Sequence, residues 1–361
     1  MFVKNGGEII QKQIEKALEN GASQIVVTGD YEIEKAIVLP ENFTIILQDA
    51  HLRLADDTYC NIFVNRSTVQ PIRTLEQTDH NINILGIGRA ILDGGKFNGL
   101  NERNSKEKGI PMTVNNLILL TNLDKFSIKG IQLRNQRWWA INLMFCSDGH
   151  LSDLDFCADD SILYVDGQRD YSWGHMDLVH KHLDKLRNAD GIDLRIGCHD
   201  ILIENITGFT EDDTVALTAL IGKEKHPYAV EGVEPSIYNV IIRNVKSSSW
   251  CANIRLLNQG GAKLYNVLID GVIDTSMNSK HMNRGLYAVR IGDEYLYSTR
   301  HSTEEETYNI IVKNVFSRAK NIINLAGSIT NCKIENVNGF DNFGTKIIST
   351  AKLFGNSKIE Q

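Results

Sequence analysis

The sequence predicts an all-β protein: a single-stranded, right-handed parallel β-helix with a short N-terminal capping helix. Three observations predict this solenoid. A seven-residue phrase recurs along the chain, apolar and polar residues alternate within the phrase, and the N-terminal segment has a helical apolar face. A single domain over residues 1–361 is expected, because only five residues are prolines and no linker-like or low-complexity tract interrupts the chain.

The repeated phrase reads approximately Asn/Asp-x-x-Ile-x-Asn/Gly-Val/Ile. It begins at Asn81, Lys125, Asp148, Asp200, Asn239, Asn266, Asn309 and Asn331. The successive spacings are 44, 23, 52, 39, 27, 43 and 22 residues. Spacings of 22 to 27 residues suit one turn of a solenoid, and the longer ones suit either one turn with an inserted loop or two turns. Since one coil cannot bury its apolar face alone, successive coils are expected to stack.

Within each phrase the second, fourth and seventh positions are usually apolar and often β-branched. This alternation predicts a strand with one face turned inward. The sixth position holds a small or amide residue, which suits a tight bend because Asn tolerates left-handed backbone geometry and hydrogen-bonds its neighbours. Amides stacked from coil to coil are therefore expected to form a ladder.

The N-terminal segment predicts a capping helix over residues 6–20. Its apolar residues, Ile9, Ile10, Ile14, Ala17 and Leu18, share one helical face, and Gly21 follows as a stop signal. A cap is needed because the terminal coil of a solenoid would otherwise expose unpaired backbone and core residues.

The composition excludes several classes of protein. A net charge of -7 and a pI near 5.8 provide no basic surface for nucleic acid or an anionic membrane. No apolar run reaches the roughly 18–20 residues of a membrane helix, and the N-terminus lacks the apolar core of a secretory signal. A cytoplasmic protein is expected, or a secreted one whose signal has been removed.

The six cysteines form no CxxC pair and are expected to be buried free thiols.

Three aspartates carry the chemical prediction. Asp190 and Asp213 are 23 residues apart, which is one coil, and each precedes an apolar alternating strand. Because stacked strands lie about 4.8 Å apart, Asp190, Asp212 and Asp213 should form one patch. Like charges this close raise at least one pKa, and glycoside hydrolysis needs one protonated and one ionised carboxyl group. The alternative is that these aspartates only bend the chain.

These residues resemble a known family. The runs 188–193 (Asn-Ala-Asp-Gly-Ile-Asp) and 211–213 (Glu-Asp-Asp) are similar to the paired Asn-Thr-Asp-Gly and Gly-Asp-Asp motifs of polygalacturonases, glycoside hydrolase family 28. Residues 86–95 and 117–141 resemble pectin-degrading β-helix enzymes, and the likeness extends over roughly residues 8–345. It implies an inverting hydrolase with Asp212 as general acid and with Asp190 and Asp213 activating water. It also implies that Asn188 binds substrate and that no cofactor or metal is needed.

The chain departs from the family at two motifs. The family's Gly-His-Gly reads Cys251-Ala252-Asn253, so Ala252 stands in the histidine position. The family's Arg-Ile-Lys, whose basic pair grips a galacturonate carboxylate, reads Arg290-Ile291-Gly292 and is followed by Asp293 and Glu294. These departures favour an exo-acting or oligosaccharide-directed activity over that of a polygalacturonase proper.

Two arginines are expected to share the cleft floor, because Arg255 falls in register with Arg290. They either bind a substrate carboxylate bidentately or neutralise Asp193, which aligns at the same level.

An insertion over residues 158–187 precedes Asp190 and is expected to overhang the cleft. Trp173 is its candidate sugar-stacking residue, although a plain surface loop is the alternative. Its histidines, His175, His180 and His182, have a spacing that fits no familiar closed metal site.

Three functions thus remain at this stage, each with a carbohydrate partner. The first is a glycoside hydrolase acting on a pectin-like or related polymer or oligosaccharide. The second is a polysaccharide lyase on the same fold, supported by Arg255 and Arg290 alone. The third is a non-catalytic sugar-binding β-helix, such as a tailspike-like adhesin. The oligomeric state is left open.

Overall fold

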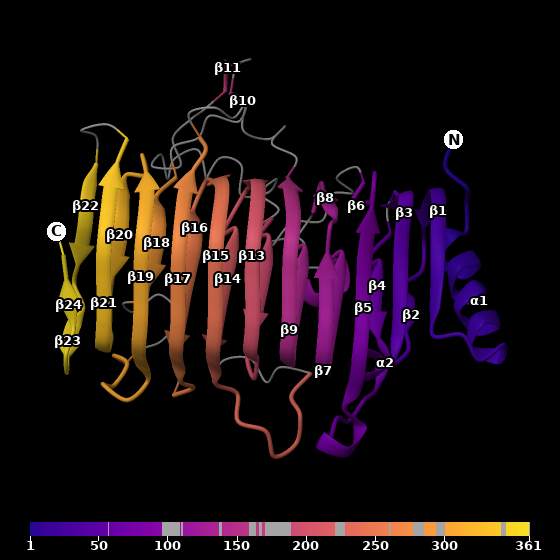
Figure 1. Cartoon of the computed structure of the whole chain (residues 1–361), viewed down its shortest axis with the longest axis horizontal. Helices are drawn as coiled ribbons and strands as arrows, with labels where there is room; N and C mark the ends of the chain where they lie inside the picture. Colours follow the sequence, from indigo (N-terminus) through magenta and orange to yellow (C-terminus); the bar gives the residue numbers. More distant parts are fainter. Residues whose placement is uncertain are drawn as a thin grey trace.

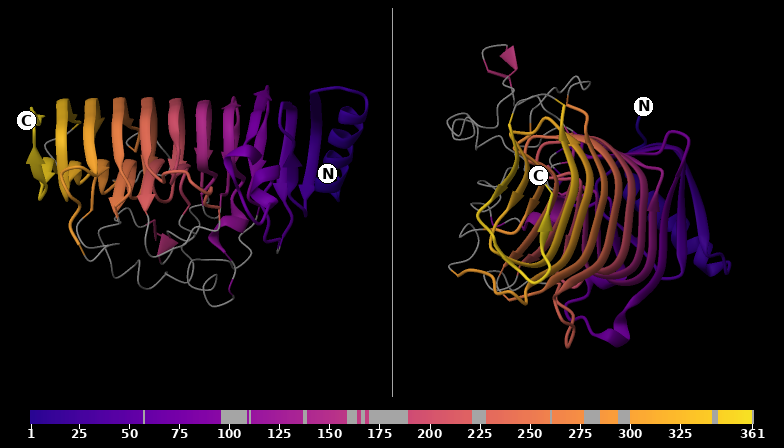
Figure 2. Two further views of the ribbon diagram at one scale, coloured as in Figure 1. Left: turned by 90° about the horizontal axis from the view of Figure 1, so that it is seen from below. Right: turned by 60° about the vertical axis from the view of Figure 1, so that its left-hand side comes forward.

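The computed structural model describes residues 1–56, 58–95, 109, 111–136, 139–158, 164–165, 168–169, 189–220, 228–259, 261–276, 285–293, 300–340 and 344–360. In these residues the chain winds into the predicted parallel β-helix, with 22 strands in one continuous sheet. Figure 1 shows the coils side by side along the long axis, and Figure 2 shows them stacked. None of the described helices is both long enough and apolar enough to pass through a bilayer.

One face of the coil is built from short strands that each follow a loop. These strands are β2 (Ile37–Leu39), β4 (Phe63–Asn65), β12 (Ile192–Arg195), β14 (Val215–Leu220), β16 (Ala252–Gln259), β18 (Tyr287–Ile291), β20 (Asn321–Leu325) and β22 (Thr345–Ser349). They pair in parallel from coil to coil, with the first parts of β7 and β9 lying between β4 and β12. We call this surface the short-strand face.

A second face is formed by long strands that also pair in parallel from coil to coil. They are β1 (Gln24–Ile33), β3 (Phe43–Leu54), β5 (Asp79–Ile87), β7 (Ile118–Lys129), β9 (Ile141–Cys157), β13 (His199–Thr210), β15 (Ile237–Ser249), β17 (Leu264–Asp274), β19 (Thr307–Ser317) and β21 (Ser328–Gly339). Minor elements are β6 (Ile91–Asp93), β8 (Gln132–Arg134), β23 (Lys352–Phe354), β24 (Lys358–Ile359), the antiparallel pair β10 (Tyr164–Val165) and β11 (Gln168–Arg169), α2 (Arg66–Val69), and the 3-10 turns η1 (Leu75–Gln77) and η2 (Met112–Asn115).

The helix α1 (Gly6–Glu19) caps the N-terminal coil, as the sequence predicts (Figure 1). Ile10 and Ile14 are fully buried against the first coil, and Ala17 packs against the same core. Leu18, which the sequence analysis placed on the buried face, is instead 46% exposed. The buried stripe is therefore narrower than predicted.

Every spacing between repeated phrases corresponds to one turn, so the two-turn alternative for the long spacings is wrong. The residues that follow Asp148, Asp200 and Asn239 pair directly across β9, β13 and β15, although these phrases begin 52 and 39 residues apart. The extra residues are inserted loops. A solenoid tolerates such loops because each coil contacts only its neighbours.

The bends at both ends of the phrase are left-handed. The sixth position has positive φ wherever it is Asn, for example φ 57 at Asn205 and φ 53 at Asn244. The first position is also left-handed, for example φ 54 at Asn239, which the sequence analysis did not anticipate. The predicted amide ladder at the sixth position is present, with Asn244 bonded to Asn205 at 2.6 Å and Asn336 to Asn314 at 2.7 Å. A second ladder runs along the first position, with hydrogen bonds of 2.8 to 3.2 Å, through Asp200, Asn239, Asn266, Asn309 and Asn331.

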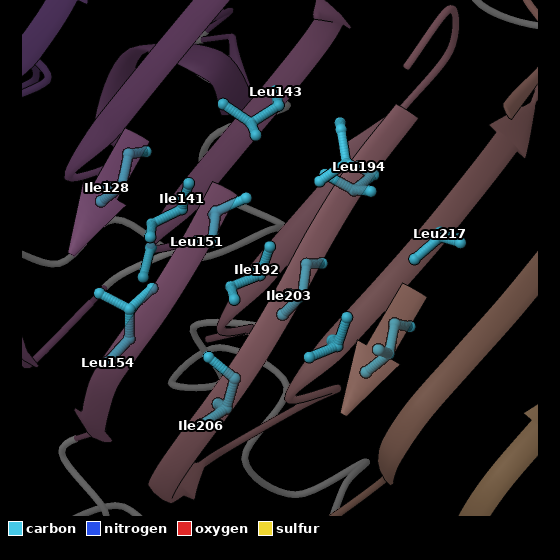
Figure 3. Packing of buried hydrophobic residues seen from close by; sticks show 14 of the residues in the cluster. Ile128, Ile141, Leu143, Leu151, Leu154, Ile192, Leu194, Ile203, Ile206 and Leu217 are labelled. Atoms are coloured by element: carbon cyan, nitrogen blue, oxygen red, sulfur yellow. The ribbon is translucent and has the colours of Figure 1, made fainter. Parts of the chain in front are cut away.

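The core fills the inside of the coil with the apolar positions of each phrase. Ile201, Ile203 and Ile206 occupy the second, fourth and seventh positions of one phrase, and each is at most 2% exposed. On the short-strand face Ile192 and Leu194 point inward to the same core (Figure 3). Their outward neighbours, Asp193 and Arg195, are left to form the candidate site, because side chains alternate along a strand.

The cysteines follow the expected pattern in part. Cys146, Cys198, Cys251 and Cys332 are buried thiols, whereas Cys60 and Cys157 are only half-buried. Burial raises the pKa of Cys332 to about 12, so this thiol stays protonated and packs as a small apolar group.

Candidate active site

The predicted aspartates come together at the start of the short-strand face. Ile192 pairs with Val215, and the Gly191 N–H donates to the Asp213 carbonyl at 2.9 Å, so Asp190 and Asp213 stand on neighbouring coils. One carboxylate oxygen of Asp212 and one of Asp213 lie within 4.8 Å of each other. We call Asp190, Asp212 and Asp213 the aspartate cluster.

Hydrogen bonds from both neighbouring coils hold the turn that presents Asp212. Its N–H and that of Glu211 donate to the Ala189 carbonyl at 3.3 and 3.0 Å. The Asp212 carbonyl accepts from Thr210 Oγ1 at 2.8 Å and from Ser249 Oγ at 2.6 Å. These bonds fix the backbone at Asp212, whose carboxylate lies within 4.8 Å of that of Asp213.

Gly191 is required for the close approach of the two coils. A Cβ built on it would meet the Thr214 carbonyl oxygen at 2.4 Å, which is shorter than real Cβ contacts allow. The glycine that follows Asp190 in the motif therefore has a packing reason, and it lets Asp190 and Asp213 stand one strand spacing apart.

Burial sets the protonation of the cluster. Asp190 and Asp213 are 5% and 4% exposed, while Asp212 is only half-buried. Burial, helped by the charge of Asp212, raises the pKa of Asp213 to about 7 against the opposing charge of Arg255. Burial and the neighbouring acids, first Asp193 and then Asp212 and Asp213, raise the pKa of Asp190 well above its usual range. The cluster therefore holds protons at a pH where isolated aspartates are ionised.

The two arginines align as predicted, with Arg255 opposite Arg290 in β16 and β18. Arg255 Nη1 lies 3.9 Å from Asp213 Oδ2, and Arg290 Nη2 donates to Asp293 Oδ1 at 3.3 Å. Asp193 is two coils from Arg255, with Ala216 between them. The arginines therefore balance acids of the short-strand face, but these acids are Asp213 and Asp293 rather than Asp193.

The backbone explains why no lysine stands at position 292. Gly292 has φ 77, and a Cβ there would meet the Ala326 carbonyl oxygen at 2.0 Å. Any side chain would force the neighbouring coil away. The backbone geometry of this coil therefore excludes a lysine at position 292.

A thiol lies beside the cluster where the family has a histidine. Ala252 is fully buried, and the preceding Cys251 has its Sγ within 4.8 Å of carboxylate oxygens of Asp212 and Asp213. Burial, followed by the charges of Asp213 and Asp212, raises the pKa of Cys251 well above its usual range, so the thiol is neutral. Cys251 is not among the site residues that the sequence predicts. Its place directly before the histidine position was the available signal.

Asp212, Asp213 and Cys251 are also the described residues that could together hold a metal ion. Carboxylate and thiolate ligands suit zinc. The guanidinium of Arg255, 3.9 Å from Asp213, opposes a second positive charge there. The site therefore does not fit a metal ion well.

Some predicted residues lie outside the described part of the chain. These are Asn188, Trp173, Glu294 and the histidines of the insertion. Of the predicted insertion over residues 158–187, only 158, 164–165 and 168–169 are described.

Comparisons with known proteins agree with the fold and with the motifs. The model of the family described as glycosyl hydrolases family 28 matches residues 34–225, just over half of the chain and including all three aspartates. No curated protein matches the sequence.

Solved structures share the fold at low sequence identity. The polygalacturonase from Erwinia carotovora ssp. carotovora has a TM-score of 0.54 at 15% identity, over 96% of this chain and 95% of that one. The pre-mature bacteriophage phi29 gene product 12 has a TM-score of 0.60 at 14% identity, over 95% of this chain and 43% of that one. A tailspike protein double mutant of E. coli bacteriophage HK620, in complex with a pentasaccharide, has a TM-score of 0.56 at 13% identity, over 96% and 55%. The chain thus spans less than two thirds of either phage protein.

Proposed function

Because the chain belongs to glycosyl hydrolases family 28, we propose that it hydrolyses a glycosidic bond of a pectin-like or related poly- or oligosaccharide by an inverting general acid–base mechanism. The observation that supports this most is the aspartate cluster, in which Asp190, Asp212 and Asp213 meet on neighbouring coils. Hydrolysis of an acetal needs an acid that protonates the leaving oxygen and a base that activates water. A carboxyl cluster with shifted pKa values supplies both.

Asp212 is proposed as the general acid, and Asp190 and Asp213 as the pair that holds and activates water. Asp212 is the most exposed of the three, so its carboxyl group can reach the leaving-group oxygen of a bound sugar. Asp190 Oδ1 and Asp213 Oδ1 make no hydrogen bond within the described residues, as expected for atoms whose partner is a water molecule or substrate. The pKa of Asp213, raised to about 7, suits a base that works near neutrality.

Inversion at the anomeric carbon is the expected stereochemical outcome. Asp190 and Asp213 are at most 5% exposed, so a water molecule reaches the sugar more readily than either carboxylate does. Oxygens of Asp212 and Asp213 lie within 4.8 Å, which is closer to the roughly 5–5.5 Å of retaining pairs than to the roughly 6.5–9.5 Å of inverting pairs. The expectation of inversion thus rests on the burial of Asp190 and Asp213, and the distance alone would favour retention. Proton NMR of the first-formed product therefore gives a sharp test. A product of retained configuration would contradict the proposed water attack.

Long polygalacturonate is expected to be a poor substrate. Gly292 supplies no cation, and the guanidinium of Arg290 is already engaged by Asp293 at 3.3 Å, so the grip on substrate carboxylates is weak. Reducing-end release should be slow or absent on the polymer and faster on some shorter oligosaccharide. The assay compares the polymer with a panel of plant cell-wall and host-glycan oligosaccharides. Robust random cleavage of the polymer would show that these departures do not control substrate choice.

A sugar-binding β-helix is the second candidate function. The absence of a histidine at Ala252 and of a lysine at Gly292 favours it. One structure of similar fold, the HK620 tailspike double mutant, is in complex with a pentasaccharide. Binding without any product, measured by calorimetry beside the product assay, would distinguish this function from hydrolysis. An unsaturated, ultraviolet-absorbing product would instead indicate the lyase.

A further inference from the structure

Arg195 is a buried arginine beside the aspartate cluster, and none of the roles above uses it. It lies on β12 two residues after Asp193, so both side chains point outward from the core. Arg195 is only 6% exposed, and its guanidinium carbon lies 4.3 Å from the centre of the Trp139 ring. Trp139 is itself 5% exposed. This stacking fixes the position of the guanidinium.

The buried acids of the site require counter-charges. Asp213 faces Arg255 at 3.9 Å. The remaining buried acids are Asp190 and Asp193, which are three residues apart in the chain and 5% and 1% exposed. Within the described ranges, Arg195 is the cation whose charge acts on both of these carboxyl groups. A buried carboxylate without such a partner is strongly disfavoured.

Arg195 also lies in the same lateral row as Gly292. The pairs Arg195–Thr218 and Thr218–Leu257 place these residues at one level, and the pairing of Leu256 with Ile291 puts Gly292 at that level as well. In this row Gly292 supplies no cation, but Arg195 supplies one, three coils away. This cation is on the Asp190 side of the cluster rather than on the Arg290 side.

We propose that Arg195, held against Trp139, is a positioning residue that favours the ionised form of the buried Asp190–Asp193 pair and orients the pair for the activation of water. The role of Asp190 rests on the proposed function, while the electrostatic control of the pair does not. Without the guanidinium, the pair stays protonated up to a higher pH and therefore acts as a base over a narrower pH range. In agreement, the charge of Arg195 lowers the pKa of both Asp190 and Asp193, against the larger effect of burial.

The test compares Arg195→Met, which removes the charge but keeps the stem, with Arg195→Lys, which keeps a charge. Carboxyl carbons of aspartate-labelled full-length protein are titrated by 13C NMR and assigned with Asp190→Asn and Asp193→Asn. We expect Arg195→Met to raise the pKa of the pair by about one unit or more and Arg195→Lys to raise it less. The acid limb of the kcat/KM profile should move to higher pH with it. The loss should fall mainly on kcat, because Arg195 acts through the base.

Arg134→Met is the matched control, since Arg134 is another arginine near a carboxylate, Asp155 at 2.6 Å, but lies on β8. It should leave the titration of the pair unchanged. If Arg195→Met does not fold, Trp139→Phe should shift the same pKa values upward by a smaller amount. Unchanged titration of Asp190 and Asp193 in the folded variants would overturn the proposal. A clear shift in a protein that hydrolyses none of the sugars would uphold it and refute the proposed function instead.

Discussion

Asp212→Asn is expected to lower turnover by about 10²–10⁴-fold while substrate affinity and fold are retained. The amide cannot donate a carboxylic proton to the leaving oxygen, yet it has nearly the same shape. The backbone at Asp212, held through its carbonyl by Thr210 and Ser249, is not altered by the change. Steady-state kinetics on the best oligosaccharide and circular dichroism of the folded chain measure the two parts of this expectation.

The residual activity of Asp212→Asn carries further information. Because the charge of Asp212 contributes to raising the pKa of Asp213, its removal should lower that pKa from about 7. The acid limb of any remaining activity should move to lower pH in step. Asp56→Asn is the matched control, because Asp56 is an exposed aspartate that pairs with Arg53 at 2.8 Å on an N-terminal coil. Equal turnover in Asp212→Asn and Asp56→Asn would remove Asp212 from the role of acid.

Asp190→Asn should produce the second large effect, a loss of activity accompanied by a gain in stability at neutral pH. Burial and three neighbouring acids raise the pKa of Asp190 well above 3.8 in the folded chain. The unfolded chain therefore binds fewer protons than the folded one between pH 4 and the raised pKa. Stability of the wild type then falls as pH rises through this window, and the uncharged amide removes the fall.

The melting temperature is the measurement for this second prediction. Near pH 4 the two proteins should melt at similar temperatures, and the variant should gain as pH rises to 7. The gain should amount to roughly 1 °C for each kcal/mol of relieved cost, because the entropy of unfolding grows with chain length. Such a gain is common where an active site stores unfavourable charge. A variant that melts lower than the wild type at pH 7, or a difference that does not depend on pH, would show that Asp190 stabilises the fold as an ion.

The architecture could be predicted from the sequence because each coil repeats the same local physics. The alternation in phrases such as that at Asp200 specifies an inward face, and the amide at the bend specifies a left-handed residue, as at Asn205. The separation of 23 residues then puts Asp190 and Asp213 on neighbouring coils. Alternation, bend residues and spacing are all properties of the order of residues along the chain, so they can be read from the sequence.

The pairing of charges could not be predicted in the same way. Register gives the row of a residue but not the direction of a long side chain, so Arg255 was aligned correctly while its facing acid, Asp213, was missed. The stacking of Arg195 on Trp139 joins two coils whose side chains meet only in space. The thiol of Cys251 likewise meets Asp212 and Asp213 only through the packing of neighbouring coils. These contacts depend on side-chain geometry across coils, which the repeat does not encode.

The mass of the products tests the central claim most directly. Oligosaccharides are incubated with the wild-type chain and, in parallel, with Asp212→Asn, and each product pair is weighed by mass spectrometry. Hydrolysis by the aspartate cluster predicts that the wild-type pair exceeds the parent sugar by one water and that the variant forms it far more slowly. A pair equal in mass to the parent sugar, or every sugar left intact by the wild type, would contradict it.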